Sequence, residues 1–143
     1  MFKAGLTDQF FLDVLNGVHQ PGDDYRIALF NQAAAPDKNP SLVSYNSTGE
    51  LPDAGGYSRG GMSLSGFMSG LLPSGGAFID WTTDPIWKNA SFTADAAVIY
   101  NASRAGKALA VISFGLTMAT NGLFTIELPA PVISLTRKSS GAQ

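Results

Sequence analysis

Short apolar runs separated by turn residues dominate the segment 77–128 and restrict the chain to a β-rich fold. Val98, Ile99 and Tyr100 form one run of strand-favouring residues, a polar turn containing glycine follows at 101–106, and 108–114 is a second apolar run. Two such runs joined by a glycine-containing turn are typical of a β-hairpin. Because the second run is apolar almost throughout, it predicts a central strand that is buried on both faces.

Other strands are expected at 25–30, 77–81, 92–100, 124–128 and 132–136. In 124–128 apolar residues alternate with Thr125 and Glu127, so one face of that strand should contact water. Short strands at roughly ten-residue spacing, with glycine and proline turns, predict an antiparallel β-sandwich or flattened barrel. We therefore expect a mainly β protein, with one β domain over 1–143 and its main β core at 77–136.

A single short α-helix is predicted at 6–17, the N-terminal part of the chain. Thr7 is a suitable N-cap, and Gly17 is a suitable C-terminal stop. Four apolar residues share one helical face, namely Phe10, Phe11, Val14 and Leu15. A helix of about ten residues is not stable alone in water, so this face should dock on the sheet or on a neighbouring subunit.

The segment 31–61 is predicted to form an extended arm, because it is rich in glycine and proline. It contains three prolines and the glycine pairs at 55–56 and 60–61. Structureless loops of about thirty residues are unusual inside a compact domain and are often functional. The segment that follows, 62–72, is ambiguous between helix and strand, since Gly66 and Gly70 weaken its helix-like apolar spacing.

The composition favours buried subunit interfaces. Charged residues make up 14% of the chain, against about 25% in a typical soluble domain, and apolar residues make up 45%. The chain lacks an apolar run of about 18 residues, so we expect no membrane span. Obligate interfaces are more apolar than free surface, which would account for the surplus. A soluble monomer rich in glycine and alanine is the alternative.

Charge and targeting signals indicate no nucleic-acid partner and no export. The net charge is −2, and the nine Lys and Arg residues are scattered rather than clustered as a nucleic-acid site requires. The sequence contains no cysteine, so disulfides and thiolate metal sites are not available. The N-terminus has no long apolar signal sequence, which predicts synthesis and assembly in the cytoplasm.

Residues with catalytic potential are few, and we predict neither an enzyme nor a cofactor or metal site. His19 is the only histidine and lies in a Pro-Gly turn, where a surface position is expected. The stretch 61–66 has the wrong spacing for a nucleophile elbow, and 55–61 lacks the Lys-Ser/Thr pair of a phosphate-binding loop. Asp80 and Asp84 flank Trp81, but an Asp-Pro turn explains Asp84 more simply than a glycosidase site.

A recurring pattern of aromatic, small and glycine residues follows the predicted hairpin. Its matching residues are Phe92-Thr93-Ala94, Ala97, Ile99-Tyr100-Asn101, Lys107-Ala108, Ala110-Val111, Phe114-Gly115 and Phe124-Thr125-Ile126. Together with the short N-terminal helix and the glycine-rich middle, this pattern resembles a widespread family of small structural proteins of tailed bacteriophages. The resemblance covers most of the chain and implies a component of the virion, made in the cytoplasm of the host bacterium.

Within the virion, the resemblance favours a decoration or cement protein that binds the outside of the phage head. Such a protein would stabilise the head through contacts with the major capsid protein and with copies of itself. A trimer would suit the threefold sites of a shell. A tail, baseplate or head–tail connector component is one alternative. A carbohydrate-binding fibre or receptor-binding domain is another.

Seven residues are candidates for contacts with partners. Phe10, Phe11, Val14, Tyr57 and Arg59 are expected at subunit interfaces, with Trp81 and Trp87 as aromatic anchors. Tyr, Trp and Arg dominate the energetics of many interfaces, which is the reason for this choice. Two other interpretations remain open: the tryptophans belong to the core, or they form a sugar-binding platform with Tyr57 and Asp80.

Overall fold

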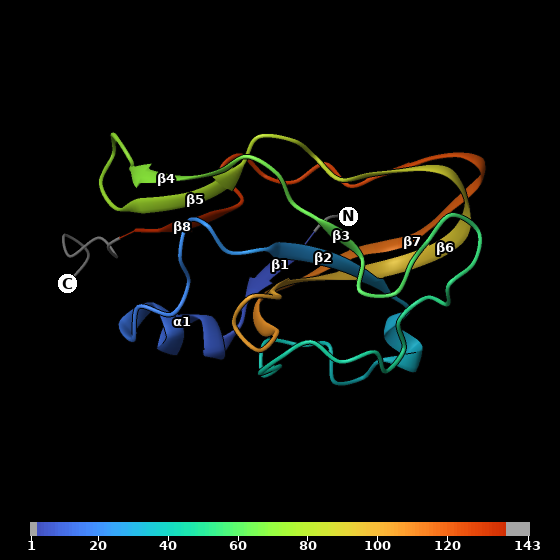
Figure 1. Cartoon of the computed structure of the whole chain (residues 1–143), viewed down its shortest axis with the longest axis horizontal. Helices are drawn as coiled ribbons and strands as arrows, with labels where there is room; N and C mark the ends of the chain where they lie inside the picture. The colour runs from blue at the N-terminus through green and yellow to red at the C-terminus, as the bar shows by residue number, and fades with distance from the viewer. Residues whose placement is uncertain (1–2, 137–143) are drawn as a thin grey trace.

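The computed structural model describes residues 3–136, whose strands form two antiparallel sheets (Figure 1). The five-stranded sheet has the order β1-β7-β6-β2-β3, and the three-stranded sheet has the order β4-β5-β8. The strands are β1 (Lys3–Leu6), β2 (Tyr25–Phe30), β3 (Met62–Ser63), β4 (Phe67–Leu71), β5 (Ala77–Trp81), β6 (Ile86–Asn101), β7 (Lys107–Thr125) and β8 (Ile133–Leu135). The prediction of a mainly β, sandwich-like fold is confirmed.

The predicted hairpin is formed by β6 and β7, and it is longer than the sequence indicated. Asn101 pairs with Lys107 across the turn, and Val98 pairs with Val111. The two strands continue to Ile86 and Thr125, with several register shifts along the way. β-Bulges of this kind bend a ribbon. Figure 1 shows the far half of the ribbon curving back over the five-stranded sheet, which gives the main core a second wall.

The main core lies between the two sheets. Ile27, Leu29, Ile99 and Leu109 are each 0% exposed there. Burying a side chain of this size stabilises a fold by about 1.5–3 kcal/mol. The alternation expected at 124–128 is confirmed, because Phe124 and Ile126 are buried while Thr125 and Glu127 are exposed. Strand periodicity therefore predicted which side chains of this segment are buried.

The segment 31–61 is packed on the domain, so the prediction of an extended arm is wrong: its first part covers the other face of the five-stranded sheet, and its second part contributes Leu51 and Tyr57 to the main core. It begins with a short 3-10 helix, η1 (Gln32–Ala34), and continues as turns. Its side chains Ala35 and Leu42 are buried against Phe30, Val98 and other residues of the sheet. Because the last part of β6, residues 96–101, and the first part of β7 are covered on both faces, their runs of apolar residues are explained.

A buried carboxylate fixes the second half of this segment. Glu50 accepts hydrogen bonds from the hydroxyls of Tyr45 and Tyr57 and, at 2.7 Å, from the backbone N–H of Gly60. The Tyr57 hydroxyl is also the acceptor for the backbone N–H of Leu29 in β2, at 2.9 Å. A buried carboxylate is tolerated when its lone pairs are satisfied in this way. These side-chain hydrogen bonds act together with two isolated β-bridges, Phe30–Glu50 and Ser44–Lys107, to hold the segment on the sheet.

The predicted N-terminal helix is α1 (Asp8–Leu15), and its cap is tied to the hairpin. Thr7 Oγ1 accepts the backbone N–H of Phe10 at 3.0 Å and donates to the Ala108 carbonyl at 2.9 Å. Gly17 adopts a left-handed φ of 65° just beyond the helix, as expected of a stop. The ambiguous segment 62–72 forms the strands β3 and β4 instead of a helix, with Gly66 at φ 75° between them.

Candidate functional site

The candidate interface residues do not share one surface. Phe10 and Tyr57 are buried at 0% and 3% exposure, whereas Phe11 and Val14 are 47% and 42% exposed. Arg59 is exposed, with its Nε donating to the Leu51 carbonyl at 3.3 Å. Phe10 and Tyr57 are therefore corrected to core residues. The helical spacing predicted one docking face of four apolar residues, but only Phe10 of the four is buried, and the helix docks mainly through Phe10 and Asp13.

The two tryptophans are core residues, and the prediction of exposed aromatic anchors is wrong. Each is 5% exposed. Trp81 packs edge-on against Tyr25 and Phe67, with ring centroids 5.5 and 5.9 Å apart. Trp87 packs against Tyr57 and Phe124, at 6.2 and 6.1 Å between centroids. A sugar platform requires exposed ring faces, so Trp81, Trp87 and Tyr57 do not form one.

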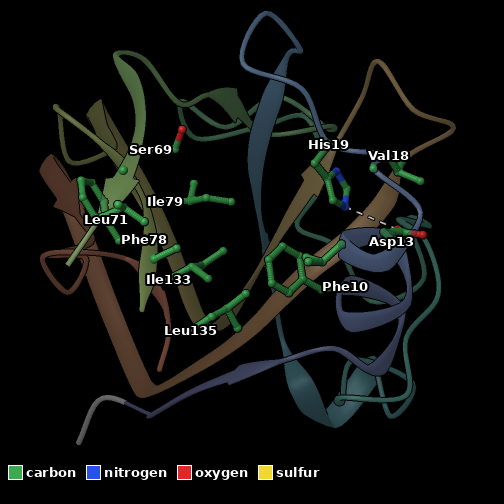
Figure 2. Close-up of a pocket in the computed structure, with 14 residues that line it drawn as sticks. Phe10, Asp13, Val18, His19, Ser69, Leu71, Phe78, Ile79, Ile133 and Leu135 are labelled. Atoms are coloured by element: carbon green, nitrogen blue, oxygen red, sulfur yellow. Dashed lines mark ion pairs between the residues drawn. The ribbon is translucent and has the colours of Figure 1, made fainter. Parts of the chain in front are cut away.

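A cavity of about 420 Å³ lies between α1 and the three-stranded sheet. Figure 2 shows Ile79, Ile133 and Leu135 of that sheet facing Phe10 across the cavity. The turn that follows α1 closes one side and contributes His19. The lining is mostly apolar, and the cavity opens to the surface near the exposed side chain of Leu71. This geometry suits an apolar group rather than a charged one.

His19 lies in the wall of this cavity and not on the surface, which corrects the expectation for it. Its side chain is 4% exposed, and its Nε2 faces Asp13 Oδ2 at 3.4 Å (Figure 2). Its Nδ1 accepts from the Asn101 amide at 3.0 Å, because that amide is also a donor to Asp23 Oδ2 at 2.8 Å. The hydrogen of neutral His19 is therefore on Nε2, the ring nitrogen nearest Asp13, although the two groups are not aligned for a hydrogen bond.

From His19, a chain of polar contacts runs through Asn101 and Asp23 to Arg104 at the surface. Asp23 forms two hydrogen bonds with the Arg104 guanidinium, at 2.8 and 3.0 Å. The hydrogen bond from Arg104 lowers the pKa of Asp23 to about 2. For His19 the largest influence is burial, which lowers its pKa below the usual value, while Asp13 and Asp23 act in the opposite direction. His19 is therefore neutral at pH 7.

These pKa shifts predict a loss of stability in mild acid. A histidine whose pKa is lowered by folding binds fewer protons in the folded state than in the unfolded state. The free energy of unfolding should therefore decrease as the pH falls below about 6.5. Asp23 adds a second decrease below about pH 4, towards its folded pKa of about 2. Urea denaturation at pH 8, 7, 6 and 5 measures the first step.

The matched variant for this pH effect is His19→Gln, which keeps a hydrogen-bonding side chain but does not titrate. Its free energy of unfolding should change less between pH 7 and pH 5 than that of the wild type. An equal slope in both proteins would show that His19 does not cause the effect. The decrease below about pH 4 should persist in the variant, because Asp23 and Arg104 are unchanged.

The sequence analysis missed the pairing of His19 with Asp13, although one signal was present. Asp13 lies three residues after Phe10, on the same helical face, where a carboxylate would be buried. A buried carboxylate requires a polar partner, and the only histidine of the chain follows six residues later. Ser69 also borders the cavity, but Figure 2 shows its hydroxyl directed away from His19.

The described part of the chain offers neither a metal-binding cluster nor a membrane-spanning helix. Residues 3–136 contain no group of three or more His, Asp or Glu side chains placed to hold a metal ion. No helix among them is long and apolar enough to cross a membrane. The features that stand out are therefore the apolar cavity, its buried polar wall and the exposed apolar side chains.

Comparisons of this chain with known proteins identify no related protein. No protein-family model, curated protein or solved structure matches this chain. The resemblance described above therefore rests on its own short segments, around Phe92, Lys107 and Phe124.

Proposed function

We propose that this chain is a structural subunit of a tailed-phage virion. Its role is that of a decoration protein, which binds the outside of the head and associates with copies of itself. One observation supports the proposal above the others: large apolar side chains are exposed in two separate patches. Proteins that act alone rarely expose apolar groups in this way, whereas interaction surfaces commonly do.

The first patch, called the helix patch, consists of Phe11, Leu12, Val14 and Leu15 on α1. Their side chains are 47%, 51%, 42% and 83% exposed. Leu71 on β4, at 85% exposure, lies at the cavity beside this helix. The open edge of β4 carries no charged residue, and charge is a common protection of edge strands against pairing.

The second patch, called the ribbon patch, consists of Leu116, Met118 and Leu123 on β7. They are 76%, 73% and 65% exposed, and there is no charged residue between Ala108 and Ile126. Figure 1 places α1 and the far part of β7 at opposite ends of the molecule. Two different apolar patches at opposite ends favour head-to-tail contacts between copies, which close into rings when the rotation permits.

The mechanism of such a protein is mechanical. Each subunit buries apolar surface against its neighbours and against the shell, and this binding opposes the outward pressure of packaged DNA. At about 25 cal/mol per Å² of apolar area, each contact is modest. Many equivalent contacts on one particle add up to a large stabilisation. The low charge of the chain is consistent with this use of its surface.

Copy number in purified particles tests the virion assignment. Quantitative mass spectrometry compares this chain with the major shell protein in particles purified from the phage that encodes it. One copy per shell protein, or one per few, is the result expected of a decoration protein. A handful of copies per particle would instead place the chain in the tail, baseplate or connector. Absence from purified particles would contradict the proposal altogether.

The ribbon patch can be tested in the purified protein by the double variant Leu116→Ser with Met118→Ser. Both side chains are largely exposed, so the fold should lose less than about 1 kcal/mol. Self-association should weaken by about tenfold or more, because central apolar contacts commonly contribute over 1 kcal/mol each. Sedimentation velocity over a concentration series measures the change. Val43→Ser, at a 52% exposed site outside both patches, is the control and should behave as the wild type.

A further inference from the structure

The segment that covers the five-stranded sheet is organised around a buried lysine. The side chain of Lys38 is 0% exposed, and its Nζ lies 4.7 Å from the centre of the Phe30 ring. Nζ donates to Asp37 Oδ1 at 2.8 Å, to Asn46 Oδ1 at 2.8 Å and to the Thr48 carbonyl at 3.0 Å. Lysine is almost never fully buried unless it is paired, and here the pairing with Asp37 brings Nζ against the side chain of Asn46 as well.

The side chains of Lys38, Asp37 and Asn46 all contact one another. Asp37 accepts from Lys38 through Oδ1 and from the Asn46 amide through Oδ2, the latter at 2.9 Å. The backbone N–H of Thr48 donates to Asn46 Oδ1 at 3.0 Å. The Lys38 ammonium thus lies against the carboxamide oxygen of Asn46, one carboxylate accepts from both nitrogens, and the Thr48 N–H group is directed at the same oxygen. These are the parts that amide exchange requires.

We propose that Lys38 and Asn46 react to form an intramolecular isopeptide bond. Asp37 accepts a proton from the Lys38 ammonium, and the lone pair of Nζ then attacks Cγ of Asn46. The C=O electron pair moves onto Oδ1, where the Thr48 N–H stabilises the negative charge. Asp37 transfers its proton to Nδ2 and takes a second proton from Nζ.

The intermediate then collapses. The Cγ–Nδ2 bond breaks, ammonia leaves, and the carbonyl of the new amide re-forms. Ammonia takes up the proton left on Asp37, so ammonium is the product and the carboxylate is restored. No oxidant or other reactant is required.

Two features of the site favour this step. The reaction occurs once per molecule and cannot reverse after ammonia has left, so a slow rate is sufficient. The carboxylate of Asp37 is 44% exposed, which gives ammonia and protons a direct route to water while Nζ stays buried. The bond would close a ring through 38–46 and fix the segment against the sheet in a chain that has no cysteine for a disulfide.

Mass spectrometry of the wild-type protein tests the proposal directly. The purified, folded protein is incubated at pH 8 and then denatured and digested with trypsin. An acylated Lys38 resists trypsin, so 27–59 should appear as one peptide, lighter by one molecule of ammonia. Cleavage after Lys38, giving 27–38 and 39–59 at full mass, would overturn the proposal. A cyclic imide at Asn46 also loses ammonia, but it leaves Lys38 cleavable and would equally overturn it.

Variants assign the roles of the three residues. Lys38→Arg keeps the charge, and Asn46→Ala removes the carbon that is attacked, so both should abolish the loss of ammonia. Asp37→Asn leaves nucleophile and electrophile in place and should slow or abolish the loss. Asn39→Ala removes another amide of the same loop, which donates to the Pro36 carbonyl, and should react as the wild type. Wild-type protein kept in guanidinium chloride during the incubation should not react, because the geometry depends on the fold.

Discussion

Replacing Phe10 with alanine should lower the free energy of unfolding by about 3–5 kcal/mol, the usual cost of removing a large buried aromatic ring. Phe10 is 0% exposed and stacks on His19, with ring centroids 5.8 Å apart. It is the main apolar contact between α1 and the rest of the core. The same change at the next residue, Phe11, removes a ring that is 47% exposed and should cost less than about 1 kcal/mol.

Urea denaturation followed by tryptophan fluorescence measures this difference. Both tryptophans are buried in the core, so their emission reports unfolding of the whole domain. Phe11→Ala is the matched control, since it changes the same residue type on the same helix. Similar losses in the two variants would mean that α1 does not dock through Phe10. The Phe11 variant should instead weaken self-association, because Phe11 belongs to the helix patch.

Gly61→Ala is expected to have the second large effect. Gly61 adopts a φ of 78°, and an added Cβ would lie 1.9 Å from the Ile27 carbonyl oxygen in β2. The left-handed backbone costs a residue with a side chain about 1–2 kcal/mol, and the overlap adds roughly 1–3 kcal/mol. We therefore expect a loss of about 2–5 kcal/mol. The cause is that Gly61 lets the segment 31–61 turn closely beside β2 before β3 begins.

Gly22→Ala is the control for this prediction. No atom lies within 4 Å of an added Cβ at Gly22, so its stability should stay within about 0.5 kcal/mol of the wild type. Thermal or urea denaturation of both variants gives the comparison. A Gly61 variant as stable as the Gly22 variant would contradict the close approach of 61 to β2. Loss of the β2–β3 pairing without global unfolding would appear as faster amide exchange at Ile27 and Met62.

The sequence predicted the elements of this fold better than their environments. The strand 25–30, the strand 77–81 and the hairpin around 101–106 follow from alternation and turn residues, which are local properties. The helix and its cap follow from Thr7 and Gly17 in the same way. What covers each element depends on distant parts of the chain. Periodicity therefore identified the apolar face of α1 but not that Phe10 alone would be buried on it.

For the segment 31–61 too, the sequence predicted the local structure but not the packing. Its composition is typical of a loop, and it does lack long strands or helices. Its folded position depends on a few apolar contacts, such as Leu42 with the sheet, and on single polar contacts, such as Tyr57 with the backbone of Leu29. Such contacts leave no periodic pattern. For the same reason the burial of His19 was missed, because its partner Asn101 is 82 residues away.

The order of the strands imposes a delay when the chain is made on the ribosome. β1 pairs with β7, with Lys3 opposite Ser113, and the Thr7 hydroxyl that caps α1 donates to Ala108, 101 residues later. The N-terminal strand and helix therefore emerge first, but the hairpin that receives them emerges among the last elements. Until then Phe10 and its neighbours remain exposed to solvent, where chaperones can bind apolar segments. Docking of the N-terminal strand and helix onto this hairpin is therefore expected to be a late step in folding.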